Sequence, residues 1–148
     1  MSKTAEMENS QYCVTIFCVM PHQATEATCP KDLFSSFEVC KENGFNVSWV
    51  QEEEALLMKP SKEDVFILAE FSGQLFTFLR KFKCTIIGPQ CLLVCVQKND
   101  PLPDVSYPVF TVGMKGLVVT STGCNTQEKK DIQEKVQFMG GIYTAAQI

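Results

Sequence analysis

Short apolar runs alternate with helical hydrophobic patterns along the first hundred residues. Residues 12–20 form a nearly continuous apolar run rich in β-branched and aromatic side chains. This composition favours a strand that is buried on both faces, as in a parallel sheet. Apolar residues then recur at helical spacing from Leu33 to Cys40, with Pro30 suited to the first helical turn and Asn43-Gly44 to the helix end. The pattern predicts a strand followed by a helix.

Three more strands are expected before residue 98. Residues 45–50 alternate apolar and polar positions, 65–69 are fully apolar, and 85–87 form a third short apolar run. Between the first two of these runs, the acidic triplet Glu52-Glu53-Glu54 and the stretch from Lys59 to Lys62 have the composition of a solvated connection.

Two further helices complete this part of the chain. Ser72 is placed as the N-cap of a helix whose polar side and C-terminal end carry Arg80, Lys81 and Lys83. Residues 91–96 favour a closing helix after Gly88-Pro89. Strands that alternate with helices predict an α/β fold with a mainly parallel sheet covered on both faces. The inward stripe of the Ser72 helix is expected to be Leu75, Phe76, Leu79 and Phe82.

The first part of this order appears again after a linker. Asn99 to Pro103 contains two prolines and two turn-forming residues, which disfavour helix and strand. Residues 117–120 predict a strand, Asn125 and Glu128 have the spacing of a capping box, and Gly140-Gly141 ends the helix before a strand at 142–143. The expected buried stripe of this helix is Ile132, Val136 and Met139.

Charge and composition exclude several classes of function. Apolar residues make up 45% and charged residues 20% of the chain, as in a folded globular protein. The formal charge of −4 provides no overall positive field, so we expect neither strong direct nucleic-acid binding nor attraction to an anionic membrane surface. The short basic clusters at Arg80, Lys81 and Lys83 and at Lys129 and Lys130 are interpreted as solvated or as complementing helix dipoles.

The eight cysteines are expected to be free thiols, and the apolar flanks of most of them favour burial. Residues 1–10 contain no apolar core of a secretory signal, which favours a reducing compartment, where disulfides are rare. The cysteines include no CxxC pair and the only histidine is His22, so the sequence predicts no metal site. Nucleotide-binding glycine motifs are also missing from the sequence, and a Cys–His catalytic pair could use only His22. We therefore expect no enzyme and no cofactor.

The second part of the chain resembles the opening of a BRCT module. In that family a first strand runs into a Thr-Gly turn, here Thr122-Gly123, and the first helix ends in a double glycine, here Gly140-Gly141. Four other stretches narrow the resemblance to the N-terminal BRCT region of the topoisomerase II-binding scaffolds, multi-BRCT proteins of replication and checkpoint signalling. The BRCT region of the Ect-type Rho exchange factors is the second choice. The four stretches are residues 52–56, 71–73, 87–90 and 107–109.

The resemblance implies a site for phosphoserine or phosphothreonine. A hydroxyl at a strand end, a glycine N–H and a helix N-terminus together favour an anion. By resemblance, Thr122 would bind a phosphate oxygen through its hydroxyl, Gly123 would donate its backbone N–H, and Lys129 would supply the basic group of the first helix. The family's lysine from a second helix cannot be assigned before the sequence stops at Ile148. An ordinary capping turn is the alternative interpretation of Thr122.

The resemblance also implies an organisation and a cellular role. We expect a disordered stretch at 1–10, a first BRCT-like module at 11–98, a linker at 99–106 and an incomplete second module at 107–148. The first module has Val19-Met20-Pro21-His22 where Thr-Gly would stand, so its expected role is packing.

The expected function is that of a nuclear, non-enzymatic scaffold in DNA replication, DNA repair, the DNA damage response and checkpoint signalling. Its partners by family analogy are phosphorylated protein tails, such as those of the checkpoint clamp and of treslin-like initiation factors. The alternatives are a regulatory BRCT region of a Rho guanine-nucleotide exchange factor, or a truncated isoform that no longer binds phosphopeptide.

Overall fold

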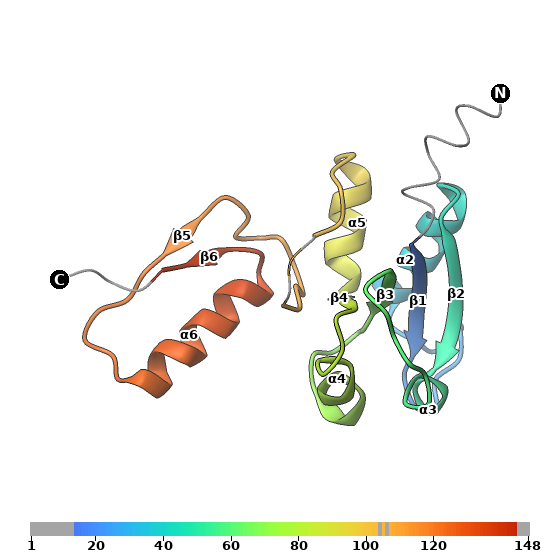
Figure 1. Ribbon diagram of the computed structural model, residues 1–148. Helices are drawn as coiled ribbons and strands as arrows, with labels where there is room; N and C mark the ends of the chain where they lie inside the picture. The colour runs from blue at the N-terminus through green and yellow to red at the C-terminus, as the bar shows by residue number, and fades with distance from the viewer. Residues whose placement is uncertain (1–13, 104, 106, 145–148) are drawn as a thin grey trace.

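A four-stranded parallel sheet forms the centre of the first part of the chain (Figure 1). The computed structural model describes residues 14–103, 105 and 107–144. The strands lie in the order β2-β1-β3-β4, and every neighbouring pair is parallel. The predicted α/β fold with a parallel sheet is confirmed. The strands are β1 (Thr15–Met20), β2 (Asn46–Gln51), β3 (Asp64–Ile67) and β4 (Thr85–Ile87).

Helices cover both faces of this sheet, because alternate strand residues point to opposite sides. On one side, Ile16 and Cys18 of β1 belong to a core with α2 (Lys31–Glu42) and α5 (Pro89–Gln97). On the other side, Val19 of β1 and Phe66 of β3 belong to a second core with α3 and α4. A fully buried side chain of this size contributes about 1.5–3 kcal/mol to stability, so both cores hold the sheet. These two further helices are α3 (Glu52–Ala55) and α4 (Gly73–Leu79).

Two local expectations for this part were wrong. The Glu52-Glu53-Glu54 stretch is a short helix instead of a connection without structure: the Glu54 carboxylate accepts a hydrogen bond from the Gln51 N–H at 3.0 Å, and Ala55 is fully buried beneath it. Phe82 lies beyond the end of α4 and is only half-buried. Ser72 is the N-cap residue as predicted, although its side chain makes no capping hydrogen bond.

The second part of the chain is a strand–helix–strand unit. β5 (Val118–Val119) pairs in parallel with β6 (Ile142–Tyr143), and α6 (Thr126–Phe138) connects them. Val136 is buried as expected. Met139 is 44% exposed, which contradicts the predicted stripe, because it follows the last helical residue as the C-cap and so leaves the helical spacing.

The double glycine lies where the chain passes closest to its neighbours. Gly140 has φ +81°, a left-handed conformation that favours glycine. A Cβ at Gly141 would lie 2.9 Å from Val136 Cγ1 and 3.2 Å from Met114 Cβ. A side chain at either glycine would therefore crowd Val136 or residues 111–114.

Residues 109–111 join the two parts. The Val109 N–H donates to the Ile86 carbonyl at 3.0 Å and the Gly88 N–H donates to the Val109 carbonyl at 3.1 Å, which adds Val109 to the edge of the first sheet. The next two N–H groups, of Phe110 and Thr111, both donate to the Phe138 carbonyl at the end of α6.

The module and linker boundaries expected from the sequence stay predictions. No helix within the described ranges is long and apolar enough to cross a membrane.

Gly88→Ala should destabilise the protein by about 1–3 kcal/mol, because a Cβ there would lie 2.4 Å from the Phe110 carbonyl oxygen. Gly113→Ala is the matched control, since its Cβ would have no neighbour closer than 3.8 Å and should change stability by less than about 0.5 kcal/mol. Urea unfolding followed by circular dichroism measures both. Equal stability of the two variants would show that the Gly88–Phe110 approach is not close in solution.

Candidate phosphate-binding site

The turn between β5 and α6 carries two of the three predicted site residues. Thr122 and Gly123 are both exposed. Gly123 has φ +73°, in the left-handed region that costs a glycine nothing, and a Cβ there would meet no atom within 4 Å. The turn therefore lies open to solvent, with its backbone shaped by the glycine.

A capping box begins α6 immediately after this turn, as the sequence predicts. The Asn125 side-chain oxygen accepts from the Glu128 N–H at 2.8 Å, and a Glu128 carboxylate oxygen accepts from the Asn125 N–H at 3.0 Å. The remaining N–H groups of the first turn have no acceptor within the helix and carry its positive dipole end. The Glu128 carboxylate places a negative charge at the same end.

Lys129, the third predicted residue, lies in the first turn of α6. Its side chain is half-buried, and its spacing from Ile132 and Val136 places it on the side of the helix that packs inward. No ion pair involves Lys129 in the part of the chain that the structure describes. Thr122, Gly123 and Lys129 thus lie on one turn and the first helical turn that follows. Their role in phosphate binding stays a prediction.

A hydroxyl pair not anticipated from the sequence supports this turn. Ser121 Oγ lies 2.6 Å from Tyr143 Oη, in a hydrogen bond that joins the ends of the two short strands. The parallel register pairs Val119 with Tyr143, so the tyrosine lies beside the point where the chain leaves β5. The turn is therefore held against β6 as well as against α6.

The equivalent turn after β1 has a different chemistry. Pro21 and His22 follow this strand, and the His22 ring is hydrogen-bonded to the Glu53 carboxylate of α3. The pKa of Glu53 is lowered, first by its backbone hydrogen bond and next by the side-chain bond to His22. An exposed histidine–glutamate pair thus occupies the place of a Thr-Gly turn. The packing role expected for this module stays a prediction.

The cysteines have the environment of packing residues. Burial raises the pKa of Cys40 and Cys91 to about 12 and that of Cys84 to about 11. Folding raises these pKa values, so keeping the thiols neutral stabilises the folded state. This stabilisation is present below about pH 9 and is lost as the pH rises toward 12. None of these three thiols is activated as a nucleophile. Among the described residues, no group of three His, Cys, Asp or Glu side chains is arranged to hold a metal.

The first part of the chain decides the family. Residues 22–112 match the family model described as "TopBP1, BRCT0 domain". The chain belongs to this family of BRCT modules. BRCT modules mediate protein–protein interactions and are typically non-catalytic. The matched residues include β2, β3 and β4 but not β1, and they end before the Thr122 turn.

Two curated relatives agree with the second resemblance found in the sequence. The chain is 34% identical to Protein ECT2 of Mus musculus over 92 residues, which are 62% of this chain, and 36% identical to Protein ECT2 of Homo sapiens over 87 residues, which are 58% of it. Each alignment covers 10% of the relative. The chain therefore spans about a tenth of the length of these relatives.

Thiol labelling at pH 8 should separate the buried cysteines from the half-buried Cys124. A rise in pKa from 9.0 to about 12 lowers the thiolate fraction of Cys40 and Cys91 about a thousandfold, and burial excludes the reagent as well. We expect N-ethylmaleimide to modify these two at least about a hundredfold more slowly than Cys124, and to reach them at similar rates in urea. Peptide mass spectrometry over time assigns each site. Rapid labelling of Cys91 in the native protein would contradict its burial.

Proposed function

We propose that this chain is a non-enzymatic scaffold module that binds phosphorylated protein segments at the turn between β5 and α6. The observation that supports the proposal most is the exposed Thr122-Gly123 turn directly before a capped helix of 13 residues. The Thr122 hydroxyl, the Gly123 N–H and the start of α6 follow one another closely along the chain. A hydroxyl, free backbone N–H groups and the positive end of a helix dipole together favour an anion. Membership of a protein-interaction family fits the same role.

In this proposal a phosphate dianion is held by three kinds of group. The Thr122 hydroxyl and the Gly123 N–H donate to phosphate oxygens, and the Lys129 ammonium adds a charge-assisted bond. A lysine provides a point charge, which is a weaker partner for phosphate than the bidentate fork of an arginine. The site then favours phosphoserine or phosphothreonine over an unmodified serine or threonine. The phosphate group carries up to two negative charges that attract these donors, whereas a hydroxyl carries none.

The cellular role that we propose follows the family resemblance. It is a nuclear role in DNA replication, DNA repair, the DNA damage response and checkpoint signalling, with phosphorylated tails of the checkpoint clamp and of treslin-like initiation factors as partners. The second candidate is a regulatory BRCT region of a Rho guanine-nucleotide exchange factor, favoured by the identity of about a third to Protein ECT2. Both candidates use the chain as a binding module.

Thr122→Ala should weaken binding of a phosphoserine peptide about 10- to 100-fold, because it removes a hydrogen bond to a charged group worth about 1.5–3 kcal/mol. Lys129→Glu should weaken it at least as much. The probe is a fluorescein-labelled 12-residue peptide of Gly, Ala and Gln around one phosphoserine, read by fluorescence polarisation with its unphosphorylated twin.

Matched controls are Thr77→Ala and Lys31→Glu, which change an exposed threonine and an exposed lysine on α4 and α2. Both should bind like the wild type, and circular dichroism should show that all four variants fold. A wild-type protein with equal affinity for the phosphorylated and unphosphorylated peptides would refute the proposed site.

Glu128→Gln should strengthen phosphopeptide binding about two- to threefold. Glutamine can still accept the hydrogen bond from the Asn125 N–H, but the negative charge beside the phosphate is gone. The same polarisation assay at low and high salt measures the gain, which should shrink as salt screens the charge. An unchanged affinity at low salt would place the phosphate away from this helix end.

A further inference from the structure

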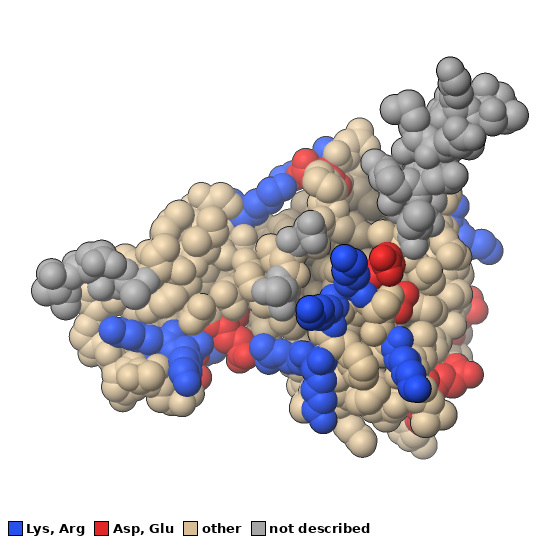
Figure 2. All heavy atoms as spheres, viewed as in Figure 1, with Lys and Arg blue, Asp and Glu red and all other residues tan. Residues whose placement is uncertain are grey.

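Basic side chains are concentrated on two segments of this acidic chain. Residues 80–83 and 126–138 contain six of the 13 basic residues but only three of the 17 acidic ones, in a chain whose net charge is −4. On the face shown in Figure 2, Lys and Arg side chains gather over α6 and the end of α4. We name these six residues the basic band: Arg80, Lys81, Lys83, Lys129, Lys130 and Lys135.

Each of the three carboxylates within the band already has a partner. Glu134 is ion-paired with Arg80 at 3.0 Å, Glu128 accepts from the Asn125 N–H, and Asp131 accepts from the Gln127 amide at 3.0 Å. Lys81, Lys83 and Lys130 make no ion pair with any described residue. These three lysines therefore have no internal ion-pair partner within the described part of the chain, and six basic against three acidic residues leave the two segments with a net positive charge.

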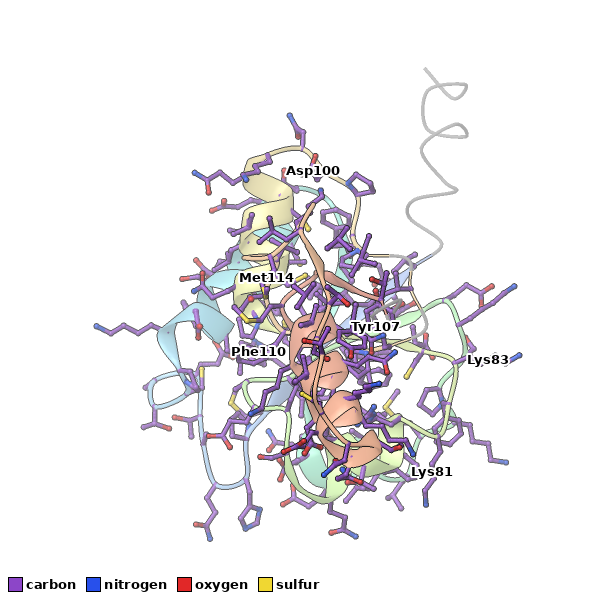
Figure 3. All side chains as sticks on the ribbon, turned by 90° about the vertical axis from the view of Figure 1, so that its left-hand side faces the viewer. Lys81, Lys83, Asp100, Tyr107, Phe110 and Met114 are labelled. Carbon is purple, nitrogen blue, oxygen red and sulfur yellow. The ribbon has the colours of Figure 1, made fainter. Side chains whose placement is uncertain are left out.

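Contacts between α4 and α6 fix the position of Lys81 relative to the Thr122 turn. The Arg80 guanidinium lies 5.2 Å from the Phe76 ring centroid and 5.9 Å from that of Phe138, in addition to its bond to Glu134. The adjacent Lys81 and nearby Lys83 project on the same side of the molecule (Figure 3). The two lysines thus follow a residue, Arg80, that is packed directly against α6.

The length of α6 sets the spacing between the turn and these lysines. Glu134, which contacts Arg80, lies eight positions after Thr126 at the start of α6. At 1.5 Å per residue this is about 12 Å along the helix. An extended peptide covers about 3.3 Å per residue, so it spans this distance in roughly four residues.

We infer that the basic band is a specificity surface for acidic residues located about four to six positions from the phosphorylated residue of a bound peptide, with Lys81 and Lys83 as its far end. This inference rests on the proposed phosphopeptide site and names the class of its ligand: a phosphorylated segment within an acidic sequence. A duplex nucleic acid fits less well, because three carboxylates interrupt the band and the chain as a whole is acidic.

Three phosphoserine peptides of 12 residues test the inference on the full chain. One is neutral, one carries three Asp residues four to six positions before the phosphoserine, and one carries them at the same distance after it. We expect one acidic peptide to bind the wild type about three- to tenfold more tightly than the neutral peptide at 50 mM salt, and less so at 300 mM. In Lys81→Gln/Lys83→Gln this preference should fall to less than about twofold, with binding of the neutral peptide unchanged.

The matched control is Lys31→Gln/Lys98→Gln, which removes the same charge at α2 and at the C-cap of α5 and should keep the preference. Equal binding of all three peptides to the wild type, with phosphate dependence intact, overturns this inference and leaves the proposed function standing. The proposed function is overturned instead if the Thr122→Ala variant still prefers the acidic peptides and binds them equally well with and without the phosphate. Displacement of the acidic peptide by an equimolar 12-base-pair duplex DNA would identify the band as a nucleic-acid surface and overturn the inference.

Discussion

The close passage of residues 109–111 between the first sheet and the end of α6 is the constraint on which the arrangement of the two parts depends. Val109 completes the edge of the sheet beside β4, and the next two N–H groups donate to the Phe138 carbonyl. Gly88 makes this passage possible because a larger residue would meet the Phe110 backbone. The strand–helix–strand unit is therefore anchored by main-chain bonds, whose geometry changes little with the side chains around them.

Aromatic side chains reinforce this anchor. The Phe71 ring lies edge-on to Phe110 and to Phe138, with centroids 4.9 and 5.1 Å away, and stacks on Phe76. Such pairs add about 0.5–1.5 kcal/mol beyond the burial of their surface. Arg80 covers the edge of this cluster. These contacts pack the first part of the chain against the C-terminal half of α6.

The sequence predicts the parts of the fold that local patterns determine. Continuous apolar runs identify β1 and β3, and the spacing of Asn125 and Glu128 identifies the start of α6. The short helix α3 is missed because its three glutamates look solvated, whereas its formation depends on Gln51 and on the burial of Ala55 beneath the sheet edge. Met139 is misplaced because helical spacing alone does not show where a helix ends.

The candidate site shows the same division between local and distant contacts. Thr122, Gly123 and Lys129 are neighbours along the chain, so a motif is enough to bring them together. The Ser121–Tyr143 hydroxyl pair and the Arg80–Glu134 ion pair join residues 22 and 54 positions apart, and no periodicity predicts them.

These distant contacts determine how charge surrounds the turn. With Glu134 paired with Arg80, the lysines Lys81, Lys83 and Lys130 have no ion-pair partner among the described residues. Water and counter-ions solvate such exposed ammonium groups, and an anionic ligand can replace the counter-ions. The physical argument for an anionic partner at this surface therefore comes from the packing of two helices as much as from the Thr-Gly motif.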